Sequence, residues 1–272
     1  MPTAEANGQS LYYEVHGEGE PLLCVMGLSA STVAWTLQVG PFSERHRTVI
    51  FDNRDAGRSS AAAEPYEIVD MAADALALAD ALELETFHLL GVSMGGAIAQ
   101  EIALAAPGRT RTLTLAVTYA RWGAWGRRHA EAWAARRLKQ TREEHVDDLL
   151  LHNLSEELFE NSEIVDYVRG VMLSEPHPQP PEAFVRQLSA SRRHDAAERL
   201  PSLGMPVHVI AAERDLQVPV WKTRELAELI PGAKLTELAG SPHGANLERA
   251  EEFNAAVLGF IAEHSGARPA AA

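Results

Sequence analysis

The chain has 272 residues, 46% of them hydrophobic and 23% charged, so it is long enough to bury a large core within a single α/β domain. Its 38 acidic and 24 basic residues give a net charge of -14, which repels phosphate backbones and anionic membranes. Neither nucleic acid nor membrane is therefore expected as a partner. The one cysteine, Cys24, allows no intrachain disulfide and no cysteine zinc cluster, and it is interpreted as a buried thiol.

The N-terminal residues MPTAEANGQS lack the basic start and apolar core of a secretion signal. No stretch approaches the roughly 20 apolar residues that span a bilayer. We therefore expect a soluble cytoplasmic protein whose C-terminal tail, SGARPAAA, has no regular structure. The sequence leaves a homo-oligomer open.

Strand-like and helix-like segments alternate in the first half of the chain. Runs rich in β-branched and aromatic residues, several of them continuously apolar as in buried parallel strands, lie at residues 10–16, 21–26, 47–52, 87–93 and 110–118. Between them, residues 66–84 space apolar side chains at helical intervals, and residues 95–108 end in a Pro-Gly pair that stops a helix. This alternation predicts a mostly parallel sheet of about eight strands with helices on both faces.

The first two of these strands are separated only by the residues GEGE. A connection of this length predicts an antiparallel hairpin at one edge of the sheet.

The pattern changes between residues 121 and 199, where helical spacing continues without any strand-like run. Alternation of strands and helices resumes afterwards. We therefore divide the chain into an α/β core (residues 1–120 and 200–272) and a helical lid inserted into it (residues 121–199).

A glycine-flanked serine lies where the strand at residues 87–93 meets the following helix. Gly91-Val92-Ser93-Met94-Gly95 fits a nucleophile elbow, in which the serine takes a strained backbone conformation and the residues two before and two after it must lack bulk. The same glycines do not form a dinucleotide-binding loop, because the second glycine of that motif is here Ser93. A tight turn without chemistry is the alternative that this motif alone leaves open.

A serine nucleophile needs a base and a group that orients the base. Asp215 follows one predicted strand in ERDLQVP, and His243 follows the next in SPHGANLE, so both come after Ser93 in the order that the elbow requires. Asp195 is a rival acid but belongs to a helical pattern, and Glu213 is a minor alternative. Ser93, His243 and Asp215 are the predicted catalytic residues.

Attack on a carbonyl also requires donors for the developing oxyanion. We expect the backbone N–H of Met94, directly after the nucleophile, to be one of them. The backbone N–H of Leu28, in the loop GLSAS, is the other, and Gly27 beside it is expected to contact substrate.

Two tryptophans at the start of the inserted segment, Trp122 and Trp125, are candidates for lining an apolar substrate entrance. Packing between the lid and the core is the alternative. The run EEHVDD lacks the His-x-x-x-His spacing of a helical zinc site and is interpreted as a solvated face. No metal and no cofactor are expected.

With these motifs, the chain resembles the α/β-hydrolase fold superfamily over nearly its whole length. The similar segments are LYYEVHGEGEPLLCVMGLSAS, WTLQVGPFSERHRTVIFDNRDAGRSS, GVSMGG, ERDLQVP and SPHGANLE. They look like those of small lid-bearing hydrolases such as 3-oxoadipate enol-lactonases, cofactor-free esterases and polyketide methylesterases. The resemblance implies that Ser93 is the nucleophile, His243 the base and Asp215 the orienting acid.

Two positions depart from the family pattern. Met26-Gly27 stands where many relatives have His-Gly, which weakens a subfamily assignment but not the mechanism, because the donor is a backbone group. Asp55 replaces the glycine of D-x-R-G-x-G-x-S, a variant similar to the polyketide methylesterase branch. Asp52, Arg54 and Arg58 are interpreted as residues that stabilise this loop.

The function that the sequence predicts is hydrolysis of a carboxylic ester or lactone of a small to medium apolar substrate through an acyl-enzyme. The alternatives are carbon-carbon bond hydrolysis, lyase or cyclase chemistry on the same triad, or a ligand-binding receptor that uses the hydrolase pocket.

Overall fold

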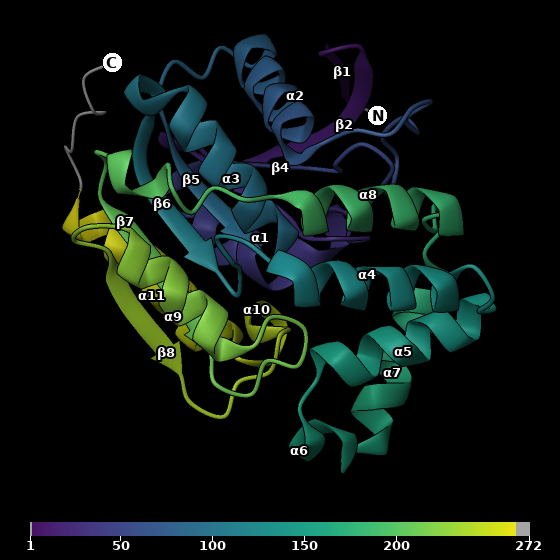
Figure 1. The fold of residues 1–272 in the computed structure, drawn as a ribbon. Coiled ribbons are helices and arrows are strands. Elements are labelled where there is room, and N and C mark those ends of the chain that lie inside the picture. The colour runs from purple at the N-terminus through teal and green to yellow at the C-terminus, as the bar shows by residue number, and fades with distance from the viewer. Residues whose placement is uncertain (1, 265–272) are drawn as a thin grey trace.

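The computed structural model describes residues 2–264, and the C-terminal tail predicted above lies outside the described residues. Eight strands form a central sheet in the order β1-β2-β4-β3-β5-β6-β7-β8 (Figure 1). They are β1 (Thr3–Ala6), β2 (Gln9–His16), β3 (Glu20–Val25), β4 (His46–Phe51), β5 (Phe87–Val92), β6 (Thr110–Ala116), β7 (Val207–Ala212) and β8 (Lys234–Leu238). β2 is antiparallel to β1 and β4, and every other neighbouring pair is parallel. The predicted mostly parallel α/β sheet is confirmed.

The predicted hairpin between β2 and β3 is wrong. β4 lies between these two strands, and β2 pairs instead with β1 and β4. A four-residue connection can span about 13 Å, and two strand spacings need only about 10 Å, so its length did not force direct pairing. The hairpin that does form joins β1 to β2 through Asn7 and Gly8, whose φ angles of 51° and 74° are those of a two-residue type I′ turn.

Helices cover both faces of the sheet. Successive side chains of the central strands point to opposite faces and therefore enter two different cores. On β3, Leu23 and Val25 join one cluster with α2 (Ile68–Ala81), α3 (Met94–Ala105) and α9 (Val220–Leu229), whereas Leu22 and Cys24 join another with α1 (Thr36–Ser43) and α11 (Ala250–Glu263). Cys24 is buried and free. The shorter helices of the core are η1 (Thr32–Trp35), η2 (Pro107–Arg109), η3 (Leu200–Ser202) and α10 (Ala245–Glu248).

Five α-helices lie between β6 and the short helix η3 that precedes β7, and they form the inserted segment. They are α4 (Gly123–Arg137), α5 (Arg142–Asn153), α6 (Glu156–Phe159), α7 (Ser162–Ser174) and α8 (Pro181–Arg193). The segment begins and ends at an isolated bridge between Arg121 and Asp195. Its helices contact loops that follow β3, β4 and β8, so it lies at the carboxyl edge of the parallel strands.

Asp55 links this segment to the core. Its buried carboxylate accepts two hydrogen bonds from Arg186 on α8, at 2.9 and 2.7 Å, and one each from the Tyr66 hydroxyl and the Ala62 N–H, both at 2.9 Å. Asp55 holds a left-handed backbone, with φ of 66°, which glycine adopts at lower cost. The departure from the family's glycine thus gives α8 an anchor at the expense of backbone strain.

We expect Asp55→Ala to lower the free energy of unfolding by about 2 to 4 kcal/mol, since breaking a buried ion pair leaves its partner without compensation. The upper limit of this free-energy range is set low because the Arg186 side chain is 25% exposed. Its guanidinium can therefore bind water once the Asp55 carboxylate is removed. Urea unfolding of the purified variant measures this change. Asp55→Gly is the matched comparison, because glycine also lacks the carboxylate but relieves the strain of the left-handed backbone. An alanine variant within about 0.5 kcal/mol of the parent would show that Asp55 does not anchor α8.

Within residues 2–264, no helix combines the length and the apolar character needed to cross a bilayer.

Candidate active site

Ser93 lies between β5 and α3 in a backbone conformation that side chains rarely adopt, with φ of 57° and ψ of -123°. Three hydrogen bonds hold it there: its N–H donates to Ala116 O at 2.9 Å, and its carbonyl accepts from the Thr118 hydroxyl at 2.7 Å and from Gly96 N–H at 2.9 Å. Strain that neighbouring structure maintains in this way is a common property of functional turns.

Both flanking glycines are sterically required. A Cβ on Gly91 would lie 2.3 Å from Gly95 O, and one on Gly95 would lie 2.1 Å from Val25 O. The turn therefore packs tightly against the end of β3, which brings the loop containing Gly27 and Leu28 next to Ser93.

The structure brings the three residues predicted as catalytic into one hydrogen-bonded chain. His243 Nε2 lies 3.0 Å from Ser93 Oγ, and His243 Nδ1 lies 2.6 Å from Asp215 Oδ2. The second carboxylate oxygen, Oδ1, accepts hydrogen bonds from the N–H groups of Gln217 and Val218 at 2.8 and 2.7 Å. Asp215 and His243 are buried, so the carboxylate is fixed in place and in turn fixes the orientation of the imidazole.

The proposed oxyanion donors lie on two sides of Ser93. Met94 is the first residue of α3, so its N–H has no partner within the helix. A Cβ on Gly27 would be 2.9 Å from Ser93 Cβ and 3.4 Å from Ser93 Oγ, which places the backbone that leads into Leu28 against the nucleophile. Within residues 2–264, neither the Leu28 nor the Met94 N–H donates to a protein acceptor.

Side chains remote in sequence hold this loop. Asn53 donates to Met26 O at 2.9 Å, and Ser29 N–H donates to Gln187 Oε1 on α8 at 3.0 Å. The Gln187 amide also donates to Arg54 O at 2.7 Å. Gln187 was not predicted, because a glutamine in an amphipathic helix carries no local signal of a contact with a loop 158 residues away.

The two tryptophans differ in environment. Trp122 is 3% exposed and belongs to the main core cluster, whereas Trp125 is 55% exposed. Their rings stack at a centroid separation of 5.9 Å. Packing accounts for Trp122, and only Trp125 presents a large open surface.

The rival acids have other partners. Glu213 accepts a hydrogen bond from Gly240 N–H, and Asp195 accepts one from Ala197 N–H. Neither is bonded to His243. In the run EEHVDD, His145 is buried with both ring nitrogens unpartnered, and burial lowers its pKa to about 4. In the described part of the chain, no group of three histidine, cysteine or acidic side chains is placed to hold a metal ion.

Asp52 and Arg54 stabilise the loop after β4. Asp52 accepts hydrogen bonds from Thr32 N–H at 2.6 Å and Arg58 N–H at 2.8 Å, while Arg54 forms a buried ion pair with Asp74 at 2.6 Å. These contacts agree with the structural interpretation of the loop.

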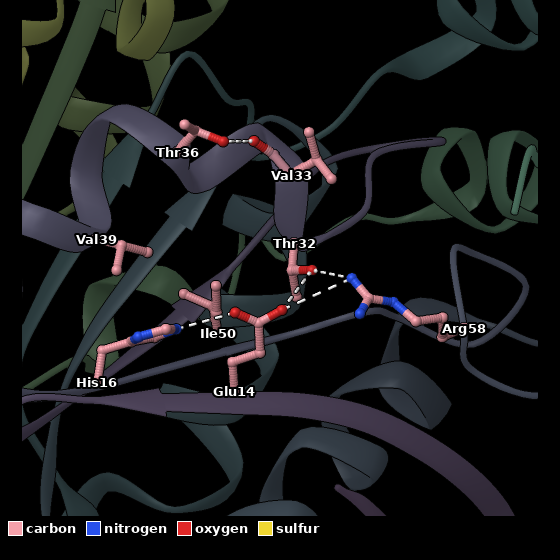
Figure 2. Close-up of a pocket in the computed structure, with 8 residues that line it drawn as sticks. All are labelled: Glu14, His16, Thr32, Val33, Thr36, Val39, Ile50 and Arg58. Carbon is pink, nitrogen blue, oxygen red and sulfur yellow. Dashed lines mark hydrogen bonds and ion pairs between the residues drawn. The ribbon is translucent and has the colours of Figure 1, made fainter. Parts of the chain in front are cut away.

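A groove of about 320 Å³ opens near this loop (Figure 2). It is lined by Glu14, His16, Thr32, Val33, Thr36, Val39, Ile50 and Arg58. Glu14 bonds to His16 at 2.9 Å and lies 3.6 Å from Arg58, so the charged side chains there are already paired. Since Ser93 and His243 are not among its lining residues, this groove is separate from the triad.

Comparison with known proteins identifies the family. Residues 20–250 match the sequence model described as the alpha/beta hydrolase fold. The chain belongs to the alpha/beta hydrolase family. It is 31% identical to a protein of Azorhizobium caulinodans named carbamate hydrolase RutD, over 97% of this chain and 99% of the relative.

Solved structures of the family are also similar. The enol-lactonase from Burkholderia xenovorans LB400 superposes with a TM-score of 0.86 at 28% identity, covering 96% of this chain and all of the enol-lactonase. Est816, described as an N-acyl homoserine lactone degrading enzyme, has a TM-score of 0.81 at 28% identity, over 95% of this chain and 100% of its own. The family and its hydrolytic character are therefore shown.

Proposed function

We propose that this protein is a serine hydrolase that cleaves a carboxylic ester or lactone through an acyl-enzyme. The observation that carries the proposal is His243, whose two ring nitrogens lie within hydrogen-bond distance of Ser93 Oγ and Asp215 Oδ2. An unactivated serine hydroxyl is a weak nucleophile, and a base in this position removes its proton as it attacks.

The chemistry follows from the geometry in two halves. His243 Nε2 takes the hydroxyl proton as Ser93 Oγ attacks the carbonyl carbon, and the N–H groups of Met94 and Leu28 stabilise the oxyanion. His243 then protonates the leaving alkoxide. In the second half, His243 activates water, which attacks the acyl-enzyme and releases the acid and free Ser93. In a lactone, the leaving alkoxide stays attached to the acyl group.

The similar proteins favour this reaction class without fixing the substrate. Two of them are named for lactone substrates and others for carbamate hydrolysis. A carbamate presents the same kind of carbonyl to the same nucleophile, so carbamate hydrolysis is the second candidate. Helices α4 to α8 serve in this proposal as the lid, because they lie at the edge of the sheet that presents Ser93.

Trapping the acyl-enzyme tests the proposal. Rapid acid quenching during turnover of 4-nitrophenyl acetate, followed by peptide mass analysis, is expected to find one acetyl group on the peptide that contains Ser93. Parallel incubation with 4-nitrophenyl dimethylcarbamate distinguishes the second candidate, because it leaves a carbamoyl group at the same residue. Acylation confined to other residues would exclude the Ser93 mechanism. So would a burst of released 4-nitrophenol without any acetyl group on the protein after quenching.

A further inference from the structure

A fully buried glutamine joins α8 to the loop that carries the proposed oxyanion donor, Leu28. Gln187 is 0% exposed. Its Oε1 accepts hydrogen bonds from the Ser29 N–H at 3.0 Å and from Gln179 Nε2 at 2.9 Å. Its NH₂ group donates to Arg54 O at 2.7 Å. Turning the amide over would set donors against donors, so these partners fix an acceptor opposite the Ser29 N–H.

The turn that contains Ser29 is strained. Ala30 N–H donates to Gly27 O at 3.4 Å, which closes a four-residue turn with Leu28 and Ser29 at its centre. Ser29 has a φ of 67°, whereas the φ of Leu28 is negative. This combination fits a type II turn, in which glycine or asparagine normally takes the third position. The left-handed conformation is disfavoured for a serine by a factor of about 5 to 30.

A type I turn would relieve this strain. The two turn types differ mainly by half a rotation of the central peptide, which here joins Leu28 to Ser29. After that rotation the Ser29 N–H would leave Gln187, and the Leu28 carbonyl would face Gln187 Oε1, so that two acceptors would meet. A net hydrogen bond favours its state by a factor of about 2 to 12, which is comparable with the cost of the left-handed serine. The bond to Gln187 therefore decides which orientation the peptide adopts.

Core residues hold both ends of this loop, whereas α8 holds its middle. Asn53 donates to Met26 O at 2.9 Å, and Thr32 N–H donates to Asp52 Oδ1 at 2.6 Å. Because the two ends are held, the peptides between them must absorb any rotation in the middle of the loop.

The peptide next to the one that rotates carries the proposed oxyanion donor. Leu28 N–H belongs to the peptide that follows Gly27, and a Cβ on Gly27 would lie only 2.9 Å from Ser93 Cβ. A donor stabilises an oxyanion only when it is aimed at the position of the developing charge. A change in the turn would therefore misdirect the Leu28 N–H relative to Ser93.

We propose that Gln187 is a positioning residue for the oxyanion hole. It holds the Leu28–Ser29 peptide in its strained orientation and thereby aims the Leu28 N–H at the oxyanion. This inference rests on the proposed hydrolase function and adds a condition to it, because Gln187 belongs to the five-helix segment. The oxyanion hole is complete only while α8 is docked on the core.

Two glutamine variants test the inference. Gln187→Met keeps the length of the side chain and removes its hydrogen bonds. We expect kcat for 4-nitrophenyl butyrate to fall by about tenfold, less than the roughly 10²-fold or more for loss of a donor, with KM within about threefold of the parent. Gln179→Met is the matched control, since Gln179 donates to Gln187 and to Asp55 O but does not contact the loop. Equal values of kcat in the two variants would overturn the inference.

Substitutions at Ser29 separate positioning from docking of α8. Glycine adopts the left-handed conformation readily, so in Ser29→Gly the turn should keep its orientation without Gln187. Adding Gln187→Met to that variant should cost about threefold or less in kcat. An undiminished tenfold loss would assign Gln187 to docking alone.

The opposite substitution at the same position does not depend on the folding of a variant in α8. Ser29→Val places a β-branched residue where the left-handed backbone is a genuine outlier, so it should lower kcat by about tenfold relative to Ser29→Gly, by a misdirected donor. Equal kcat in the valine and glycine variants would overturn the inference.

Binding of propyl trifluoromethyl ketone separates failure of this inference from failure of the hydrolase proposal. The Ser93 hydroxyl adds to the ketone carbonyl, His243 takes the proton, and the resulting hemiketal oxyanion occupies the oxyanion hole without turnover. Fluorine NMR titration should give an affinity about tenfold weaker in Gln187→Met and unchanged in Gln179→Met. Equal affinities would overturn the positioning role alone. A parent protein that forms no adduct at Ser93 would overturn the hydrolase proposal and this inference together.

Discussion

Replacing Ser93 with alanine is expected to lower kcat/KM for 4-nitrophenyl esters by about 10⁴-fold or more, as loss of a triad nucleophile does. The structural reason is that Ser93 Oγ is the atom that His243 Nε2 approaches at 3.0 Å. Steady-state hydrolysis of 4-nitrophenyl butyrate by the two purified proteins gives the ratio. The remaining rate should show no pre-steady-state burst, because no acyl-enzyme can form.

The substitution isolates the chemistry from folding. Alanine keeps the Cβ that serine already carries at φ of 57°, and the hydrogen bonds that hold the turn are made by the backbone of residue 93. The melting temperature should therefore stay within a few degrees of the parent. Ser174→Ala, which removes an exposed hydroxyl bonded to Val171 O, is the matched control. Rates of Ser93→Ala equal to those of the control would exclude Ser93 as the nucleophile for these esters.

The sequence was sufficient for the family, the class of sheet and the loops that carry the candidate triad. Parallel strands all present their carboxyl ends at one edge of the sheet. Ser93, Asp215 and His243 each follow a recognisable strand, so their proximity could be expected without knowing any angle. The steric need for Gly91 and Gly95 likewise follows from a local motif.

Strand order at the edge was not predictable from the same reasoning. Periodicity identifies a strand but not its neighbour, and the short GEGE connection favoured the wrong pair. The Asn7-Gly8 turn was a stronger hairpin signal, and it would have placed an additional strand before β2.

Contacts between the five-helix segment and the core could also not be predicted from the sequence. Arg186 and Asp55 are 131 residues apart, and Gln187 and Ser29 are 158 apart. Such pairs depend on how α8 docks, which a helical pattern does not determine. The same holds for Arg192, which the sequence presents as one of two adjacent arginines in RRHD and the fold buries against Trp122.

Replacing Asp215 with asparagine is expected to lower kcat by about 10⁴-fold while leaving the fold intact, because it reverses the tautomer of the base. The two N–H groups of Gln217 and Val218 require an acceptor at the Oδ1 position. The asparagine oxygen will therefore occupy that position, and its NH₂ group will face His243 Nδ1. Nδ1 must then accept a hydrogen bond, which leaves the proton on Nε2, where it cannot receive one from Ser93.

Asp195→Asn is the matched control, since Asp195 is the rival acid in the sequence and lies at the end of the five-helix segment with its own partners. It should retain activity within about threefold of the parent. Burst kinetics with 4-nitrophenyl acetate distinguish the two variants, because Asp215→Asn slows acylation itself and should show no burst. If Asp215→Asn kept most of its activity, the imidazole would have to be oriented by another group, and the triad proposed here would lose its acid.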